Sequence, residues 1–91
     1  MRAAASPEVR ALKGLMRYAK KLILEINGMV GEQMLYYAEA IGYFRLYVLR
    51  PPELRQGGST NDLQVFGGFA DLEGISRLCL RLEEVRATLQ Q

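Results

Sequence analysis

The chain of 91 residues has no histidine, no tryptophan and one cysteine, Cys79. Without histidine, the usual zinc sites and the Ser–His and Cys–His catalytic pairs cannot be assembled, and the commonest acid–base residue is missing. The pair Gly57-Gly58 is not followed by the Lys-Ser/Thr of a phosphate-binding loop. The sequence therefore predicts a protein that is not an enzyme, with no catalytic residues, no cofactor and no metal site.

A single cysteine cannot form an intramolecular disulfide, which fits a reducing compartment. The first ten residues, MRAAASPEVR, lack the apolar segment of a signal peptide. The expected location is therefore cytoplasmic.

The length corresponds to one domain, which we place at residues 1–91 with residues 1–5 disordered. The hydrophobic content of 49% is too high for a disordered chain. A chain this short leaves much of its surface exposed, and oligomerisation is a common remedy.

The stretch from Val30 to Arg50, VGEQMLYYAEAIGYFRLYVLR, has the highest apolar content of the chain. The few polar positions of this stretch are scattered. On a helix, its apolar residues form a heptad-like line: Val30, Met34, Tyr37, Ile41, Phe44 and Val48. A helix that is apolar nearly all round needs several neighbours. We therefore expect copies of the chain to pair through this central helix, or to bind a protein partner. The interface would consist of side chains outside the main line: Tyr36, Tyr43, Tyr47, Leu35 and Leu46.

Two other interpretations of this stretch stay open. The segment YFRLYVL, residues 43–49, is aromatic and rich in β-formers, so it could be a strand. The whole stretch also approaches membrane-spanning length, but Glu32, Glu39 and Arg45 would be costly near the bilayer centre.

Before this stretch, Ser6-Pro7-Glu8 has the sequence of a helix start, and a strongly amphipathic segment follows. Asn27-Gly28 is a suitable stop and predicts a helical hairpin. One continuous helix through Gly28 is an alternative, because the apolar phase continues, and Asn-Gly between apolar runs could also form a β-hairpin.

Pro51-Pro52 ends the central element, and residues 51–62 form the expected loop. A short helical turn capped by Asn61 or Asp62 would follow. The last helix is predicted to start after the capping residue Asp71, with an apolar seam and a Glu73–Arg77 pair at i, i+4.

Few side chains in this sequence could carry chemistry. Glu39, inside an apolar segment, is expected to pair with a basic residue of the first helix. Cys79 is expected to be a small core residue, and the adjacent Glu83 and Glu84 to be solvated.

The charge distribution provides the other functional candidate. Residues 1–27 carry six basic and two acidic side chains, whereas residues 51–91 carry four basic and six acidic ones. The basic face of the first helix could contact phosphates of nucleic acid, or an acidic partner, through Arg10, Lys13, Arg17, Lys20 and Lys21. The opposite, apolar face could attach this helix to a membrane surface, but a buried second helix would compete for that same face.

Together these patterns predict an all-α fold, with a helical hairpin of residues 7–27 and 30–50 and a C-terminal helix over residues 71–90. The predicted function is that of a small helical interaction or regulatory protein acting through protein–protein contacts. A nucleic-acid-binding subunit is the alternative.

Overall fold

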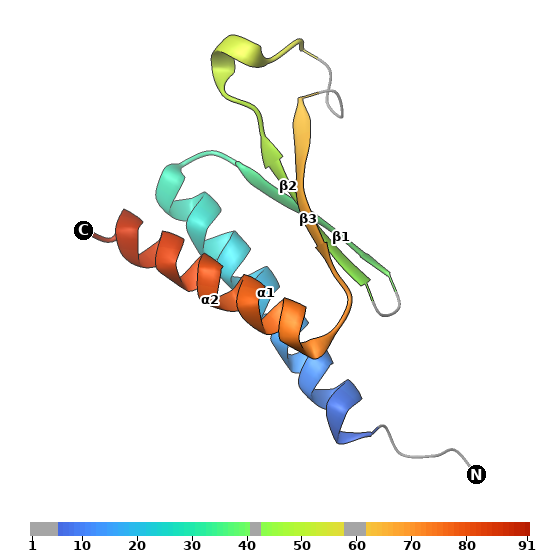
Figure 1. The fold of residues 1–91 in the computed structure, drawn as a ribbon. Helices are drawn as coiled ribbons and strands as arrows, with labels where there is room; N and C mark the ends of the chain where they lie inside the picture. The colour runs from blue at the N-terminus through green and yellow to red at the C-terminus, as the bar shows by residue number, and fades with distance from the viewer. Residues whose placement is uncertain (1–5, 41–42, 58–61) are drawn as a thin grey trace.

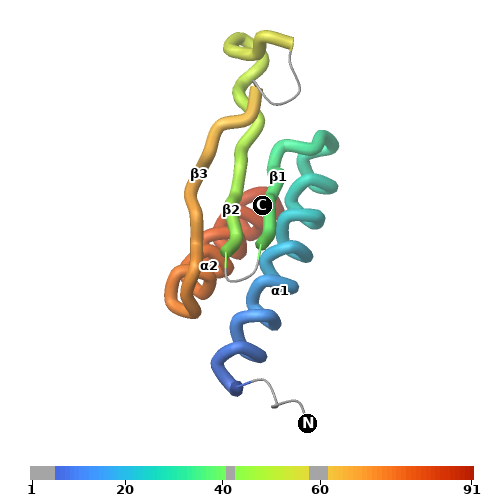
Figure 2. The backbone as a smooth tube through the Cα atoms, turned by 90° about the vertical axis from the view of Figure 1, so that its right-hand side faces the viewer, coloured from blue at the N-terminus to red at the C-terminus, as the bar shows by residue number. Residues whose placement is uncertain are grey.

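A computed structural model describes residues 6–40, 43–57 and 62–91. They form helix α1 (Pro7–Val30), strands β1 (Leu35–Ala40) and β2 (Tyr43–Leu49), the 3₁₀ turn η1 (Pro52–Leu54), strand β3 (Leu63–Phe69) and helix α2 (Leu72–Leu89). The strands make one antiparallel sheet in the order β1-β2-β3. Figures 1 and 2 show that both helices lie on the same side of this sheet. The fold is α+β, with two layers.

The prediction of an all-α fold is therefore wrong, and the larger error lies in residues 30–50. This stretch is mainly the β1–β2 pair, in register from Leu35 opposite Val48 to Ala40 opposite Tyr43. The alternative of a strand over residues 43–49 is confirmed, and its bounds are those of β2. Ile41 lies outside the described residues. In a strand pair, the backbone N–H and C=O groups of the two strands form hydrogen bonds with each other. This apolar stretch therefore does not need helices packed on every side.

Helix α1 begins as predicted and ends later than predicted. The hydroxyl of Ser6 accepts a hydrogen bond from the Val9 N–H at 3.1 Å, and Pro7 occupies the first helical position. The helix continues past Asn27-Gly28 and ends at Gly31, whose φ of 80° is in the left-handed region that favours glycine. The predicted stop, the single long helix to residue 50 and the β-hairpin at Asn27-Gly28 are all wrong.

The side chain of Asn27 attaches β1 to α1, which explains why this residue does not end the helix. Its Oδ1 accepts hydrogen bonds of 2.9 Å from the backbone N–H groups of Met34 and Leu35, and its Nδ2 donates to the Leu35 carbonyl at 3.0 Å. The Asn27 amide thus bonds to the backbone N–H and carbonyl of Leu35 as a neighbouring strand would, at the open edge of the sheet.

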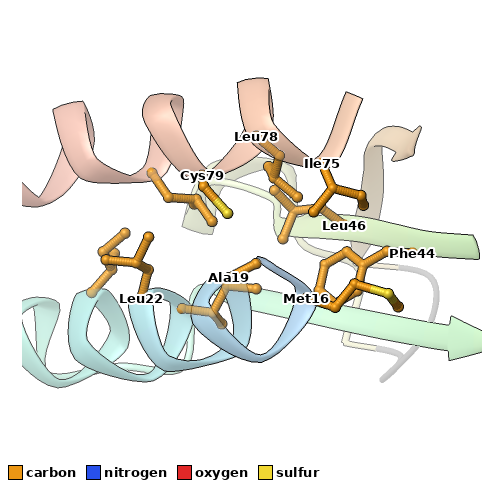
Figure 3. Close-up of a cluster of buried hydrophobic side chains, with 11 residues drawn as sticks. Met16, Ala19, Leu22, Phe44, Leu46, Ile75, Leu78 and Cys79 are labelled. Carbon is orange, nitrogen blue, oxygen red and sulfur yellow. The ribbon is translucent and has the colours of Figure 1, made fainter. Parts of the chain in front are cut away.

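The core lies between the two helices and the sheet face that they cover (Figure 3). The sheet contributes Phe44 and Leu46, which are 0% and 3% exposed, and Phe69 packs at the margin. The helices contribute the remaining buried side chains: Met16, Ala19, Leu22, Ile23, Ile26, Ile75, Leu78, Cys79 and Leu82. Each large side chain buried in this way stabilises the fold by about 1.5–3 kcal/mol.

Helix α2 confirms the prediction for the C-terminal segment. Asp71 caps it by accepting from the Gly74 N–H at 2.7 Å, and Glu73 pairs with Arg77 at 2.7 Å. Tyr18 of α1 donates a hydrogen bond to Glu83 of α2, and Arg86 of α2 pairs with Glu25 of α1 at 2.6 Å. These contacts fix the two helices against each other at the edge of the core.

The helical turn expected after Asp62 is wrong, because those residues form strand β3. Asp62 is buried, and its carboxylate accepts hydrogen bonds from the N–H groups of Gln56 and Gly57 at 2.6 and 3.1 Å. Its own carbonyl accepts from the Arg50 N–H at 2.8 Å. Asp62 therefore joins the two ends of the β2–β3 connection, and the chain enters a strand rather than a helix. The predicted disordered residues 1–5 and the alternative capping residue Asn61 lie outside the described residues.

Candidate interaction surface on the open face of the sheet

The sheet face opposite the helices is covered by no element in the described part of the chain. We call it the outer face. Strand alternation and the observed registers place the following residues on it: Tyr36, Ala38, Ala40, Tyr43, Arg45, Tyr47, Leu49, Leu63, Val65 and Gly68. Arg45 is the only charged member. Antiparallel sheets with one solvated face usually alternate apolar and polar residues, so the near absence of charge here is unusual.

Alternating residues of β2 form an ordered polar row within this face. The guanidinium of Arg45 donates from Nε and Nη2 to the Tyr43 hydroxyl at 3.3 and 3.2 Å, and it lies 5.4 Å from the Tyr43 ring centre. Hydrogen bonds to the hydroxyls of Tyr43 and Tyr47 raise the pKa of Arg45. The row therefore holds one fixed positive charge between two aromatic rings.

Tyr43 also lies across β3 at Gly68. A Cβ atom at residue 68 would be 1.8 Å from the Tyr43 hydroxyl oxygen and 2.6 Å from its Cζ. The glycine thus provides the space in which the ring lies close to the sheet.

Small side chains leave a shallow hollow beside the row. A cavity of about 240 Å³ is lined by Ala38, Glu39, Ala40, Tyr43, Arg45 and Tyr47. A side chain of a partner could enter this hollow and reach Arg45.

The five residues predicted as an interface are divided between the two faces of the sheet. Tyr36, Tyr43 and Tyr47 share the outer face, and Tyr36 is directly opposite Tyr47. Leu46 is buried in the core and Leu35 packs against the core, so the structure places both on the helix side. The idea of an interface made by a central helix is therefore wrong, because that helix does not exist.

The predicted basic face of the first helix is present on α1 but is partly engaged. Lys20 pairs with Glu39 at 2.9 Å and lies 5.9 Å from the Tyr37 ring centre. This confirms the predicted pairing of Glu39 with a basic residue of the first helix. Lys13, Arg17 and Lys21 are exposed on one stripe, and Arg10 is exposed near the helix start.

The other candidate groups have structural roles. Cys79 is buried, its thiol donates to the Leu15 carbonyl at 3.4 Å, and burial raises the pKa of that thiol. Cys79 is thus a core residue, as predicted. Glu83, expected to be solvated, instead accepts the hydrogen bond from Tyr18, and together with burial this hydrogen bond raises the pKa of Tyr18.

Sequence reasoning missed Arg45 and Gly68 as parts of this surface. The signal for Arg45 is the period-two pattern of Tyr43, Arg45 and Tyr47, which matters only if the segment is a strand. The signal for Gly68 could not be found in the sequence, because it depends on the pairing of β3 with β2.

Within residues 6–40, 43–57 and 62–91, no three acidic or cysteine side chains come together as a metal site. No helix in the same ranges combines the length and apolar character needed to cross a bilayer. Comparisons with protein-family models, with curated proteins and with solved structures found no match.

Proposed function

We propose that this chain is a small non-enzymatic interaction protein that binds a partner protein through the outer face of its sheet. The observation that carries the proposal is the composition of this face, where Arg45 is the single charged residue among ten. Uncharged, partly aromatic surfaces with one or two arginines are typical of the centres of protein interfaces.

The chemistry of the face favours a particular kind of partner. A guanidinium that is covered without an acceptor for its charge is strongly unfavourable. The partner should therefore place a carboxylate opposite Arg45 and apolar side chains over Tyr36 and Tyr47. A second copy of the outer face does not meet this requirement, because it holds no carboxylate and brings a second arginine.

The experiment is a selection of displayed peptides against the folded protein, followed by binding measurements on purified peptides. We expect enriched peptides to contain Asp or Glu flanked by apolar residues. Arg45→Glu should abolish their binding and should favour peptides with Lys or Arg in a second selection. The matched control is Arg77→Glu, since Arg77 is an exposed arginine of α2 far from this face.

Two results would contradict the proposal. The first is that Arg45→Glu and Tyr47→Ala leave binding of the enriched peptides unchanged. The second is that the enriched peptides bind elsewhere, as shown by equal losses with Arg45→Glu and Arg77→Glu.

Binding of nucleic acid by α1 is a second candidate, favoured by the exposed stripe of Lys13, Arg17 and Lys21 at spacings of four residues. None of these three has a side-chain partner within the residues that the structure describes. Contacts to phosphates would make binding to DNA or heparin fall steeply with salt. Glutamate at all three positions should then abolish retention on heparin, whereas Arg45→Glu should reduce it less.

A further inference from the structure

An apolar groove lies on the helix side of the sheet, away from the outer face. It has a volume of about 320 Å³ and is bordered by the C-terminal parts of both helices, the start of β1 and the middle of β2 and β3. Arg81 is the only charged residue that lines the groove.

Large apolar side chains at the groove remain exposed. The exposed fractions are 43% for Val30, 52% for Phe66, 38% for Val85 and 42% for Leu89.

The charges around Val85 indicate which molecule covers this region. Arg81 and Glu84 have opposite signs and lie with Val85, Thr88 and Leu89 on one exposed stripe of α2. When two such helices pack antiparallel about an axis between Arg81 and Val85, Arg81 of each copy comes near Glu84 of the other. A two-fold interface requires a surface that is complementary to itself, and this stripe has that property.

We infer that the groove is covered by the C-terminal half of α2 from a second copy of this chain, in an antiparallel two-fold dimer. Val85 and Leu89 of each copy then contact the apolar lining of the other. This surface is separate from the outer face, so the dimer does not depend on the proposed function.

The test is light scattering of exposed charge variants, alone and mixed. The wild-type chain should have twice the chain mass of 10.3 kDa. Arg81→Glu and Glu84→Arg should each weaken dimerisation at least tenfold, because each homodimer then brings like charges together. An equimolar mixture of the two variants should recover the dimer mass, since their charges complement each other across the interface.

Further variants distinguish this dimer from association elsewhere. Val85→Glu should give a monomer with an unchanged circular dichroism spectrum, whereas Arg45→Glu on the outer face should remain dimeric. A monomeric wild type at the highest soluble concentration would overturn the inference. So would a dimer that survives Val85→Glu, or two charge variants that do not recover the dimer when mixed.

Discussion

Replacing Gly68 with alanine tests the packing of Tyr43 across the outer face. The added Cβ would lie 1.8 Å from the Tyr43 hydroxyl oxygen, so the ring must leave its place and its contact with Arg45. Inserting a methyl group into occupied space typically destabilises a protein by about 1–3 kcal/mol. Alanine is favoured over glycine within a strand by about 0.5–1 kcal/mol, which offsets part of this loss.

When Tyr43 is replaced by alanine, Gly68→Ala should raise the free energy of unfolding instead of lowering it. In that background the added methyl group meets no ring, and only the preference of a strand for alanine over glycine remains. The free energy of unfolding, measured by urea denaturation of the four variants in a double-mutant cycle, should show a coupling of about 1–3 kcal/mol. Gly14→Ala is the control, since its Cβ would have no neighbour within 4 Å and its effect should be independent of Tyr43. A coupling below about 0.5 kcal/mol, the usual limit of additivity, would refute the described position of the Tyr43 ring.

Three further predictions concern single side chains. Asn27→Ala removes three hydrogen bonds to Met34 and Leu35 and should lower the free energy of unfolding by about 2–3 kcal/mol, measured with urea, whereas Asn27→Asp keeps the acceptor bonds and should lose less. Because burial raises its pKa, the Cys79 thiol should react slowly with iodoacetamide at pH 8 and rapidly once urea unfolds the chain; fast labelling of folded protein, seen by mass spectrometry, would contradict its burial. The hydrogen bond to Glu83 raises the pKa of Tyr18 in the folded state, so its stabilising effect is present below pH 10 and is lost as the pH rises above that value. Urea midpoints measured across this range should therefore fall more for the wild type than for Tyr18→Phe, and parallel curves would argue against the bond.

The two helices could be predicted from the sequence because their signals are local. Ser6 and Asp71 cap their helices, and the apolar residues that follow recur at helical spacing next to clearly polar ones. The end of α1 was misplaced because Asn27 forms its bonds with β1, which is a tertiary contact. No local pattern distinguishes such an asparagine from one that ends a helix.

The sheet could not be predicted because both of its faces are largely apolar. A half-exposed strand is normally identified by polar residues at every second position. In β2 the inner Phe44 and Leu46 alternate with the outer Tyr43 and Tyr47, so the period of two is hidden. The same residues then match a helical line by coincidence.

Tyr36, Tyr43 and Tyr47 share one face of the sheet although the secondary structure predicted for them is wrong. Residues four apart, such as Tyr43 and Tyr47, lie on the same side in a helix and also in a strand. Tyr36 joins them only through its register opposite Tyr47, which local spacing does not determine. Leu46 was placed with them because a helix does not separate odd from even positions.

The outer face and the apolar groove lie on opposite sides of one thin sheet. A pair of chains joined through α2 would therefore keep both outer faces accessible, and each pair would be bivalent. A partner that carries two matching sites would be held by avidity, with the second contact strengthened by a high effective concentration. Weak binding at each face would then suffice for a long-lived complex, and dilution of the chain to monomers would release the partner.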